Sequence, residues 1–379
     1  MQNFTLVLLI SATALIACSQ DQSTSQSATA IEVNQEVFDL QSFYSSSEAL
    51  NQAVNEVYSG LSERERVAQM IVASLGKLGK PYPAVEPLIV SRSIGGIIFL
   101  SGDPAQFKSD IKSINELSTG WPLIMSMDAE PSLFNRRMPG TPEMQPTSEL
   151  STTSQINDAV GVINEILHDI GFHHNYAPVI DVSPDNEAIG NRTMGGDSAS
   201  IVPLATAFVK ATQNDQIVAT IKHFPGHGRV QGDTHKKLVF IDGELTEVSI
   251  YKPLIEAGAL SVMVGHIAIE NNAKLATEGM PSTLSHAVVT GLLREEMKFE
   301  GLIITDAMNM GAVAAIPNSS LLAAKAGCDI ILMPPDEVGS LESILNEMKT
   351  DPEFNHQIEE SVKRIIRLKL CLGMEFQNI

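Results

Sequence analysis

The segment from Lys222 to His235 concentrates side chains that can transfer protons or bind metal ions. Its fourteen residues include three histidines, a lysine and an aspartate, at Lys222, His223, His227, Asp233 and His235. Pro225, Gly226 and Gly228 interrupt the segment, so these side chains cannot share one helix face. The preceding run Ile217–Ile221 is apolar and partly β-branched, which is typical of a buried strand. Titratable side chains therefore begin where a buried strand ends and a loop starts.

Two kinds of chemistry fit this segment. A histidine, with an unperturbed pKa near 6.5, can donate and accept protons close to neutral pH. Asp233, two residues before His235, could hold one ring nitrogen and fix the tautomer. His223, His227 and His235 could instead bind zinc. The Pro-Gly break after His223 excludes the helical histidine pair of the zinc proteases, and we predict no metal and no cofactor.

Short apolar runs alternate with helical periodicity along most of the chain. The runs predicted to be strands are Ile94–Leu100, Leu123–Met127, Tyr176–Val182, Ile217–Ile221, Leu260–Val264, Leu302–Thr305 and Ile330–Met333. Strands alternating with helices indicate parallel pairing through βαβ units. Several runs are followed by a polar or acidic residue, namely Asp128, Lys222, His266 and Asp306. This pattern predicts an α/β fold, a TIM-type (β/α)8 barrel with some irregularity, whose site lies at the carboxyl ends of the strands. An open doubly wound sheet is the alternative, but no Gly-rich phosphate loop follows the first strand.

Helix signals mark both ends of the predicted barrel domain, residues 46–379. Helical patterning begins at Glu48–Tyr58, and Ser62 with Glu65 forms a capping box that opens the next helix. The C-terminal segment Ile358–Leu372 places Lys and Arg on one side and Ile, Val and Leu on the other. This is the pattern of an amphipathic helix that packs on the domain.

The N-terminus predicts export and lipid anchoring. Residues 1–17 are uncharged and contain the apolar run Leu6–Ile10, which is too short for a stable membrane span. Leu15–Cys18 resembles a bacterial lipobox with Cys18 as the lipidated residue. Met1–Thr5 lacks the usual basic residues, and an ordinary signal peptide or a buried N-terminal element is the alternative. Ser19 resembles an outer-membrane sorting signal, so we expect the periplasmic face of the outer membrane or the cell surface.

Residues 18–45 are predicted to be a flexible tether, because the first part is rich in Ser, Gln, Thr and Ala without an apolar period. Cys328 and Cys371 remain beyond the tether, and the sequence leaves open whether they pair. The net charge of −20 argues against nucleic-acid binding, which requires clustered Lys and Arg. The sequence leaves the oligomeric state open.

The motifs resemble those of family 3 glycoside hydrolases, specifically the bacterial β-N-acetylglucosaminidase branch. The resemblance covers roughly residues 60–372 and starts from KHFPGHG followed by Asp-Thr-His. The other similar stretches, in family order, are Trp121–Glu130, Gly171–Val182, Gly190–Thr193, Met263–Ile267, Pro281–Ser285, Gly301–Met310 and Ala326–Asp329. The resemblance implies a barrel enzyme that hydrolyses terminal β-linked N-acetylglucosamine.

The resemblance also assigns roles. It implies that Asp306 is the nucleophile, that His235 is the acid/base and that Asp233 orients His235. Most retaining glycosidases use a carboxylic acid in place of this histidine. The residues implied to hold the sugar are Asp128, Arg136, Arg192, Lys222 and His223.

One motif departs from the family pattern. The family sequence D-x-E-G-G-R-V-x-R is replaced by Asp128-Ala129-Glu130 followed by Pro131–Arg136, so both glycines and the first arginine are missing. Pro131 restricts the backbone, and the loop is expected to differ in shape.

We therefore expect a lipid-anchored, retaining exo-β-N-acetylglucosaminidase acting on chitin- or peptidoglycan-derived fragments. Its partners would be the carbohydrate substrate and, through lipid only, a membrane. A β-N-acetylglucosaminide phosphorylase or a β-glucosidase of the same family is an alternative, because a neutral histidine tolerates an incoming phosphate dianion better than a carboxylate does. A non-catalytic glycan-binding lipoprotein is an alternative of a different class.

Overall fold

The computed structural model describes residues 38–182, 186–230, 232 and 237–377. The predictions for Cys18, for the signal peptide and for Asp233 and His235 fall outside these residues.

Eight parallel strands of the described chain form one sheet, in the order β10-β1-β2-β3-β4-β5-β7-β9. They are β1 (Ile71–Leu75), β2 (Gly96–Phe99), β3 (Ile124–Met127), β4 (His174–Asn175), β5 (Val218–Phe224), β7 (Ser261–Val264), β9 (Leu302–Thr305) and β10 (Ile331–Leu332). A bridge between Ile304 and Ile330 brings the last strand beside β9 and nearly closes the sheet. The prediction of a (β/α)8 barrel is confirmed.

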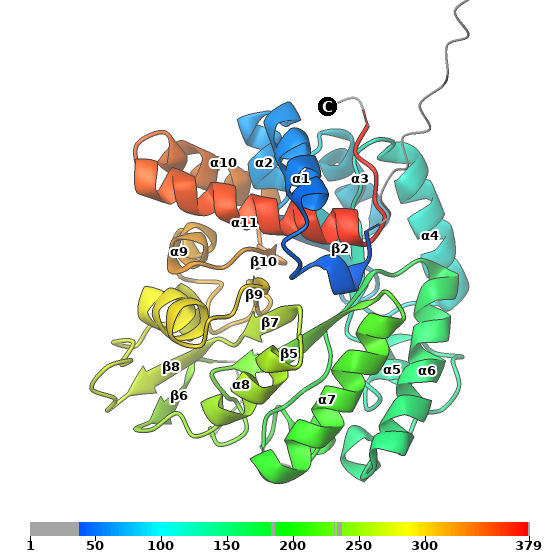
Figure 1. The fold of residues 1–379 in the computed structure, drawn as a ribbon, viewed down its shortest axis with the longest axis vertical. Coiled ribbons are helices and arrows are strands. Elements are labelled where there is room, and N and C mark those ends of the chain that lie inside the picture. Colours follow the sequence, from blue (N-terminus) through cyan, green and yellow to red (C-terminus); the bar gives the residue numbers. More distant parts are fainter. Residues whose placement is uncertain (1–37, 183–185, 231, 233–236, 378–379) are drawn as a thin grey trace, which may run out of the picture. The chain divides into compact units, whose positions relative to one another are not determined.

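Helices surround the barrel (Figure 1). They are α1 (Glu48–Gly60), α2 (Glu63–Ala68), α3 (Tyr82–Val90), α4 (Pro104–Leu117), α5 (Phe134–Arg137), α6 (Thr153–Ile170), α7 (Ser198–Asn214), α8 (Val248–Glu256), α9 (Ser319–Ala326), α10 (Glu337–Met348), α11 (Pro352–Cys371) and a π-helix (Ala287–Glu296). The predicted capping box is present, because Ser62 and Glu65 each accept a backbone N–H of the other. A separate two-stranded parallel ribbon, β6 (Val239–Asp242) with β8 (Ile267–Glu270), was not predicted.

The strand predictions differ from the structure around β4 and β1. The predicted strand Tyr176–Val182 is wrong, since β4 ends at Asn175 and only Val179 bridges to β5 afterwards. Pro178 lies in this stretch and has no N–H to donate to a ladder. Strand β1 was missed, because its five residues follow the short helix α2 closely and carry no alternating pattern; all five are buried.

The packed part of the chain begins before residue 46, the predicted start of the barrel domain. Leu40 and Phe43 are buried, although the sequence assigned them to the tether. The Tyr44 hydroxyl donates to the Ala259 carbonyl at 2.7 Å, and Arg367 of α11 donates to the Phe43 carbonyl. Helix α11 also packs beside α1, so the two ends of this unit lie together (Figure 1).

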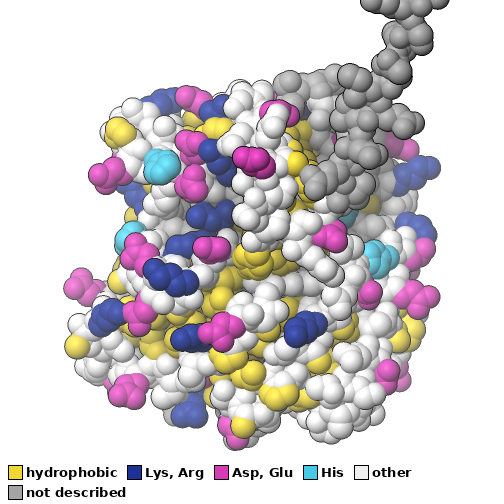
Figure 2. Space-filling view, in the orientation of Figure 1, with side chains coloured by type: hydrophobic (Ala, Val, Ile, Leu, Met, Phe, Trp, Pro, Cys, Tyr) yellow, Lys and Arg dark blue, Asp and Glu magenta, His cyan; other side chains and the backbone are white. Residues whose placement is uncertain are grey.

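The surface carries both signs of charge, and acidic and basic side chains are interspersed across the face shown in Figure 2. No helix in the described ranges is long and apolar enough to cross a membrane. Cys328 and Cys371 are both buried, with free thiols.

Candidate active site

A pocket of about 390 Å³ opens at the carboxyl ends of the barrel strands. The six predicted site residues that the structure describes all line it: Asp128, Arg136, Arg192, Lys222, His223 and Asp306. Residues from the ends of β3, β5 and β9 therefore meet in one cavity, as the parallel arrangement requires.

Asp306 directly follows β9 and presents a carboxylate with few partners. Its Oδ1 accepts the Ala307 N–H at 2.7 Å, and no other hydrogen bond to this carboxylate occurs in the described residues. Burial raises the pKa of Asp306, but the neighbouring His223 and His266 and the Ala307 N–H outweigh it and lower the pKa to about 2. Asp306 is therefore ionised at neutral pH with Oδ2 available to attack a ligand.

Lys222 and Arg192 join two carboxylates at the base of the pocket. The Lys222 Nζ lies 2.7 Å from both Asp128 Oδ1 and Glu130 Oε1. Arg192 binds Glu130 with two bonds, Nε to Oε2 at 2.7 Å and Nη2 to Oε1 at 2.8 Å. Burial alone would lower the pKa of Lys222, but Asp128 and Glu130 outweigh it and raise the pKa. These paired charges form a rigid polar wall that can hydrogen-bond several hydroxyl groups of a sugar.

His223 is held by a buried aspartate. Its Nδ1 lies 2.7 Å from Asp181 Oδ2, and its backbone N–H donates to the same carboxylate. Asp181 also accepts the backbone N–H of His227 at 2.7 Å. Burial raises the pKa of Asp181, but His223 outweighs it, so the carboxyl pKa is lowered. This arrangement leaves Nε2 of His223 to face the pocket.

Two neighbouring arginines stand at the end of the altered stretch, in the short helix α5. Arg136, which the sequence matched to the family arginine, lines the pocket with an exposed side chain. Arg137 lies closer to the polar wall, with Nη2 at 3.6 Å from Asp128 Oδ2. Its Nε is buried and has no hydrogen-bond partner among the described residues.

The sequence analysis assigned no role to four residues that shape this site: Glu130, Asp181, Arg137 and His266. The first two stand inside motifs that the sequence analysis quoted, the D-x-E stretch and the stretch ending at Val182, so the signal was present. His266 follows β7 and its ring contacts Thr283 Oγ1 at 2.8 Å and the Ala307 carbonyl at 3.0 Å. It therefore supports the segment that carries Asp306.

Curated relatives and solved structures agree on one family. A "Beta-hexosaminidase" of Glaesserella parasuis serovar 5 (strain SH0165) is 29% identical over 262 residues, covering 66% of this chain and 75% of that protein. "Beta-hexosaminidase LpqI" of Mycobacterium bovis (strain BCG / Pasteur 1173P2) is 27% identical over 330 residues, covering 82% of this chain and 83% of that protein.

A family 3 β-N-acetylglucosaminidase from Paenibacillus sp. str. FPU-7 superposes with a TM-score of 0.75 at 26% identity. The match covers 83% of this chain but only 63% of the Paenibacillus chain. The model of the glycosyl hydrolase family 3 N-terminal domain matches residues 62–368, and the chain belongs to this family.

Proposed function

We propose that the protein is a retaining exo-β-N-acetylglucosaminidase that removes terminal β-linked N-acetylglucosamine from chitin- or peptidoglycan-derived fragments. The observation that carries the proposal is Asp306, which is ionised and accepts one hydrogen bond from the described residues. It lies in the same pocket as the polar wall formed by Asp128, Lys222, Glu130 and Arg192. The names of the two hexosaminidase relatives and of the Paenibacillus enzyme support the choice of sugar.

The reaction would proceed in two displacements. Asp306 Oδ2 attacks the anomeric carbon, and His235 donates a proton to the departing glycosidic oxygen as the bond breaks. His235, now neutral, then takes a proton from water, which attacks the same carbon and releases Asp306. Asp233 would hold the imidazole in the tautomer that both steps need.

The polar wall would hold the non-reducing sugar. Asp128, Lys222 and Arg192 offer fixed donors and acceptors to its hydroxyl groups, and His223 offers Nε2. Binding of this kind orients the anomeric carbon toward Asp306, and such orientation lowers the barrier by fixing the reacting groups in advance.

The test is a comparison of 4-nitrophenyl β-N-acetylglucosaminide with the matching β-glucoside, each with and without phosphate. We expect faster turnover of the N-acetylglucosaminide, a β-configured sugar as first product, and no acceleration by phosphate. Formation of a sugar 1-phosphate would identify a phosphorylase, and preference for the glucoside would identify a β-glucosidase. Binding without turnover of either substrate would identify a glycan-binding protein.

We also propose that Cys18 carries lipid and anchors the protein at the periplasmic face of the outer membrane or at the cell surface. The support is the apolar run Leu6–Ile10 followed by Leu15–Cys18. Two or more acyl chains anchor a protein stably, whereas one binds only marginally. Cys18→Ser is expected to move the protein from the membrane fraction to the soluble fraction or to block its processing. A wild-type protein found in the soluble fraction would contradict the proposal.

A further inference from the structure

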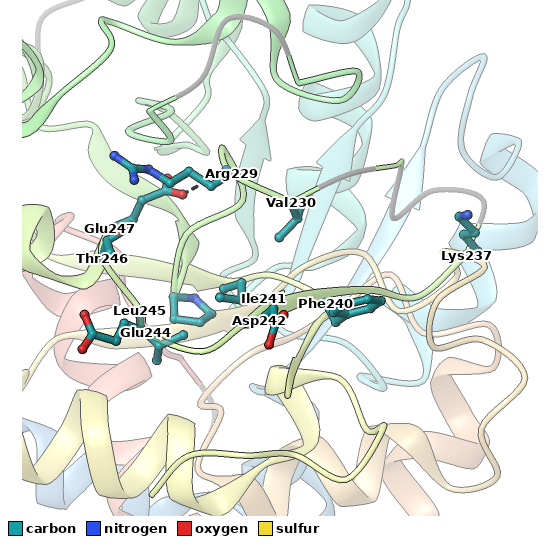
Figure 3. A pocket seen from close by; sticks show the side chains of 11 residues that line it. Arg229, Val230, Lys237, Phe240, Ile241, Asp242, Glu244, Leu245, Thr246 and Glu247 are labelled. Carbon is teal, nitrogen blue, oxygen red and sulfur yellow. Dashed lines mark hydrogen bonds between the residues drawn. The ribbon is translucent and has the colours of Figure 1, made fainter. Parts of the chain in front are cut away.

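Glu247 is a buried carboxylate that the proposed reaction does not use. It directly precedes α8, and only 6% of its surface is exposed. No cation in the described part of the chain pairs with it; its partners are three backbone N–H groups. Oε2 accepts Val182 N at 3.0 Å and Gly228 N at 3.3 Å. Oε1 accepts Arg229 N at 3.1 Å, the bond drawn in Figure 3.

These bonds join α8 to two loops of the active site. Val182 follows Asp181, the residue that holds His223. Gly228 and Arg229 belong to the turn after β5, where the preceding N–H, that of His227, donates to Asp181. Three successive N–H groups of this turn are therefore held by two carboxylates. Together, Asp181 and Glu247 fix both the position and the direction of the turn.

The approach between the turn and Glu247 is very close. Gly226 has φ of +127°, and a Cβ there would lie 2.5 Å from the Glu247 Cβ. Any other residue at position 226 would therefore push the turn away from the carboxylate that holds it.

Cavities border the turn on two sides, and Val230, which follows it, packs on Val239 and Ile267. His227 lines the sugar pocket, while Pro225, Arg229 and Val230 line a second cavity of about 650 Å³ together with Glu247 (Figure 3). A turn between two cavities depends on its hydrogen bonds for a defined path.

The surroundings of Glu247 disfavour its ionised form. Burial and then the neighbouring Asp181 raise the pKa of Glu247 to about 7, although its three N–H bonds act in the opposite direction. The Tyr251 hydroxyl on α8 also lies close enough to interact with it. A buried acidic group beside a like charge is retained here because an apolar side chain could not accept the three N–H groups.

We propose that Glu247 is a positioning residue for the acid/base: by fixing residues 226–229 it sets the point from which the chain leads to Asp233 and His235. Arg229 precedes His235 by six residues. This inference rests on the proposed role of His235. Displacement of a general acid by about 1 Å can cost on the order of 100-fold in rate.

The experiment compares two substrates whose leaving groups differ in their need for a proton. In Glu247→Gln, one acceptor oxygen is replaced by an NH2 group that opposes a backbone N–H. We expect kcat/KM for chitobiose to fall about 10- to 100-fold. The loss on 4-nitrophenyl β-N-acetylglucosaminide is expected to stay within about threefold, because nitrophenol leaves without a proton. Inhibition by free N-acetylglucosamine should be unchanged.

Two further variants control for folding and charge. Glu244→Gln makes the same charge change on an exposed side chain of the same segment, without a side-chain hydrogen bond, and should leave both substrates unaffected. In Gly226→Ala the added Cβ pushes the turn away from Glu247, and this variant should reproduce the loss on chitobiose. It provides a second test if Glu247→Gln does not fold, which thermal melting shows. Equal losses on both substrates, at matched folded fraction, would overturn the inference.

The variant His235→Ala separates this inference from the function on which it rests. If His235→Ala loses activity equally on both substrates, the acid/base assignment fails and the inference fails with it. If His235→Ala shows the chitobiose-selective loss but Glu247→Gln does not, only the role of Glu247 is wrong. The inference predicts that Glu247→Gln has no added effect on chitobiose in the His235→Ala background, since the two residues act through one step.

Discussion

The two ends of the barrel both contain buried charged groups but use them differently. At the carboxyl ends of the strands, Lys222 and Asp306 face the sugar pocket. At the amino ends, Lys369 of α11 contacts residues that precede β1, β2 and β3, and Asp329 lies just before β10. Neither Lys369 nor Asp329 lines the pocket.

The difference lies in how many hydrogen bonds are already filled. An ammonium group has three donors. Lys369 uses all three, donating to Gln69 Oε1, the Gly95 carbonyl and the Pro122 carbonyl at 2.6, 2.8 and 2.7 Å. Within the part of the chain that the structure describes, Lys222 has two carboxylate partners, Asp128 and Glu130.

The two aspartates show the same contrast. Asp329 accepts three bonds, from Arg294, Arg364 and the Ile303 N–H. From the described residues, Asp306 accepts one, from Ala307. Lys369 and Asp329 therefore have their bonding capacity filled by the protein, whereas Lys222 and Asp306 keep capacity for a ligand. Burial and charge alone do not distinguish the two roles.

The largest expected effect separates the two aspartates. Asp306→Asn should lower kcat by about 10⁴-fold or more, because a covalent nucleophile is removed. The melting temperature should change little, since the amide oxygen can still accept the Ala307 N–H. Activity on 4-nitrophenyl β-N-acetylglucosaminide and thermal melting measure the two quantities.

Asp329→Asn is the matched variant with the opposite expectation. It leaves two guanidinium groups without their carboxylate, and breaking a buried pair costs roughly 3–5 kcal/mol of stability. The protein that remains folded should keep its kcat. A large loss of kcat in folded Asp329→Asn would remove the distinction between the two ends.

The two lysines give a smaller contrast. Lys222→Met should lower kcat/KM about 100-fold, because truncating one partner of a hydrogen-bonded charge pair costs several kcal/mol of binding. Lys369→Met leaves three acceptors unpaired, which costs roughly 1–3 kcal/mol of stability. Its kcat/KM should equal that of the wild type. Denaturant unfolding with steady-state kinetics on both variants provides the comparison.

The smallest expected effect is a pH dependence of stability. Burial lowers the pKa of Lys369 to about 7, whereas an unfolded lysine titrates near 10.4. Between these values the unfolded chain binds a proton that the folded chain lacks, so this group makes the fold more stable as pH rises.

The free energy of unfolding of wild type relative to Lys369→Met should therefore rise between pH 7 and 9, by about 1 kcal/mol per pH unit. The difference between wild type and Lys222→Met should stay flat in this window, because the carboxylates keep Lys222 protonated. If the difference between wild type and Lys369→Met does not change with pH in this window, the three acceptors keep Lys369 protonated in the folded protein.

The sequence predicted the carboxyl end of the barrel better than the amino end. Asp306 directly follows β9 and Lys222 lies near the carboxyl end of β5. Parallel strands bring such positions together whatever the exact helix packing. Lys369 belongs to a segment whose basic residues were predicted to line one side of an amphipathic helix, yet it is fully buried. Helical periodicity records which side chains share a face. It contains no information on the carbonyl groups that the tertiary fold brings to that face.

The same reasoning explains why the sequence did not identify Glu247 or Arg137. Glu247 precedes a helix and resembles any exposed glutamate in the sequence, because its backbone partners come from residues 18 to 65 positions away. The choice between Arg136 and Arg137 depended on the path of a loop that lacks the family's glycines, and only coordinates show which arginine approaches Asp128.

Asp306 is the buried carboxylate at the end of β9 whose Oδ2 accepts no hydrogen bond from the described residues, and we propose that this oxygen attacks the sugar. Incubation with a fluorinated N-acetylglucosamine derivative that accumulates the covalent intermediate, followed by proteolysis and mass spectrometry, tests it most directly. We predict a single sugar adduct on Asp306 and no adduct in Asp306→Asn. An adduct on Asp128, Glu130 or another carboxylate in the wild-type protein would contradict the account.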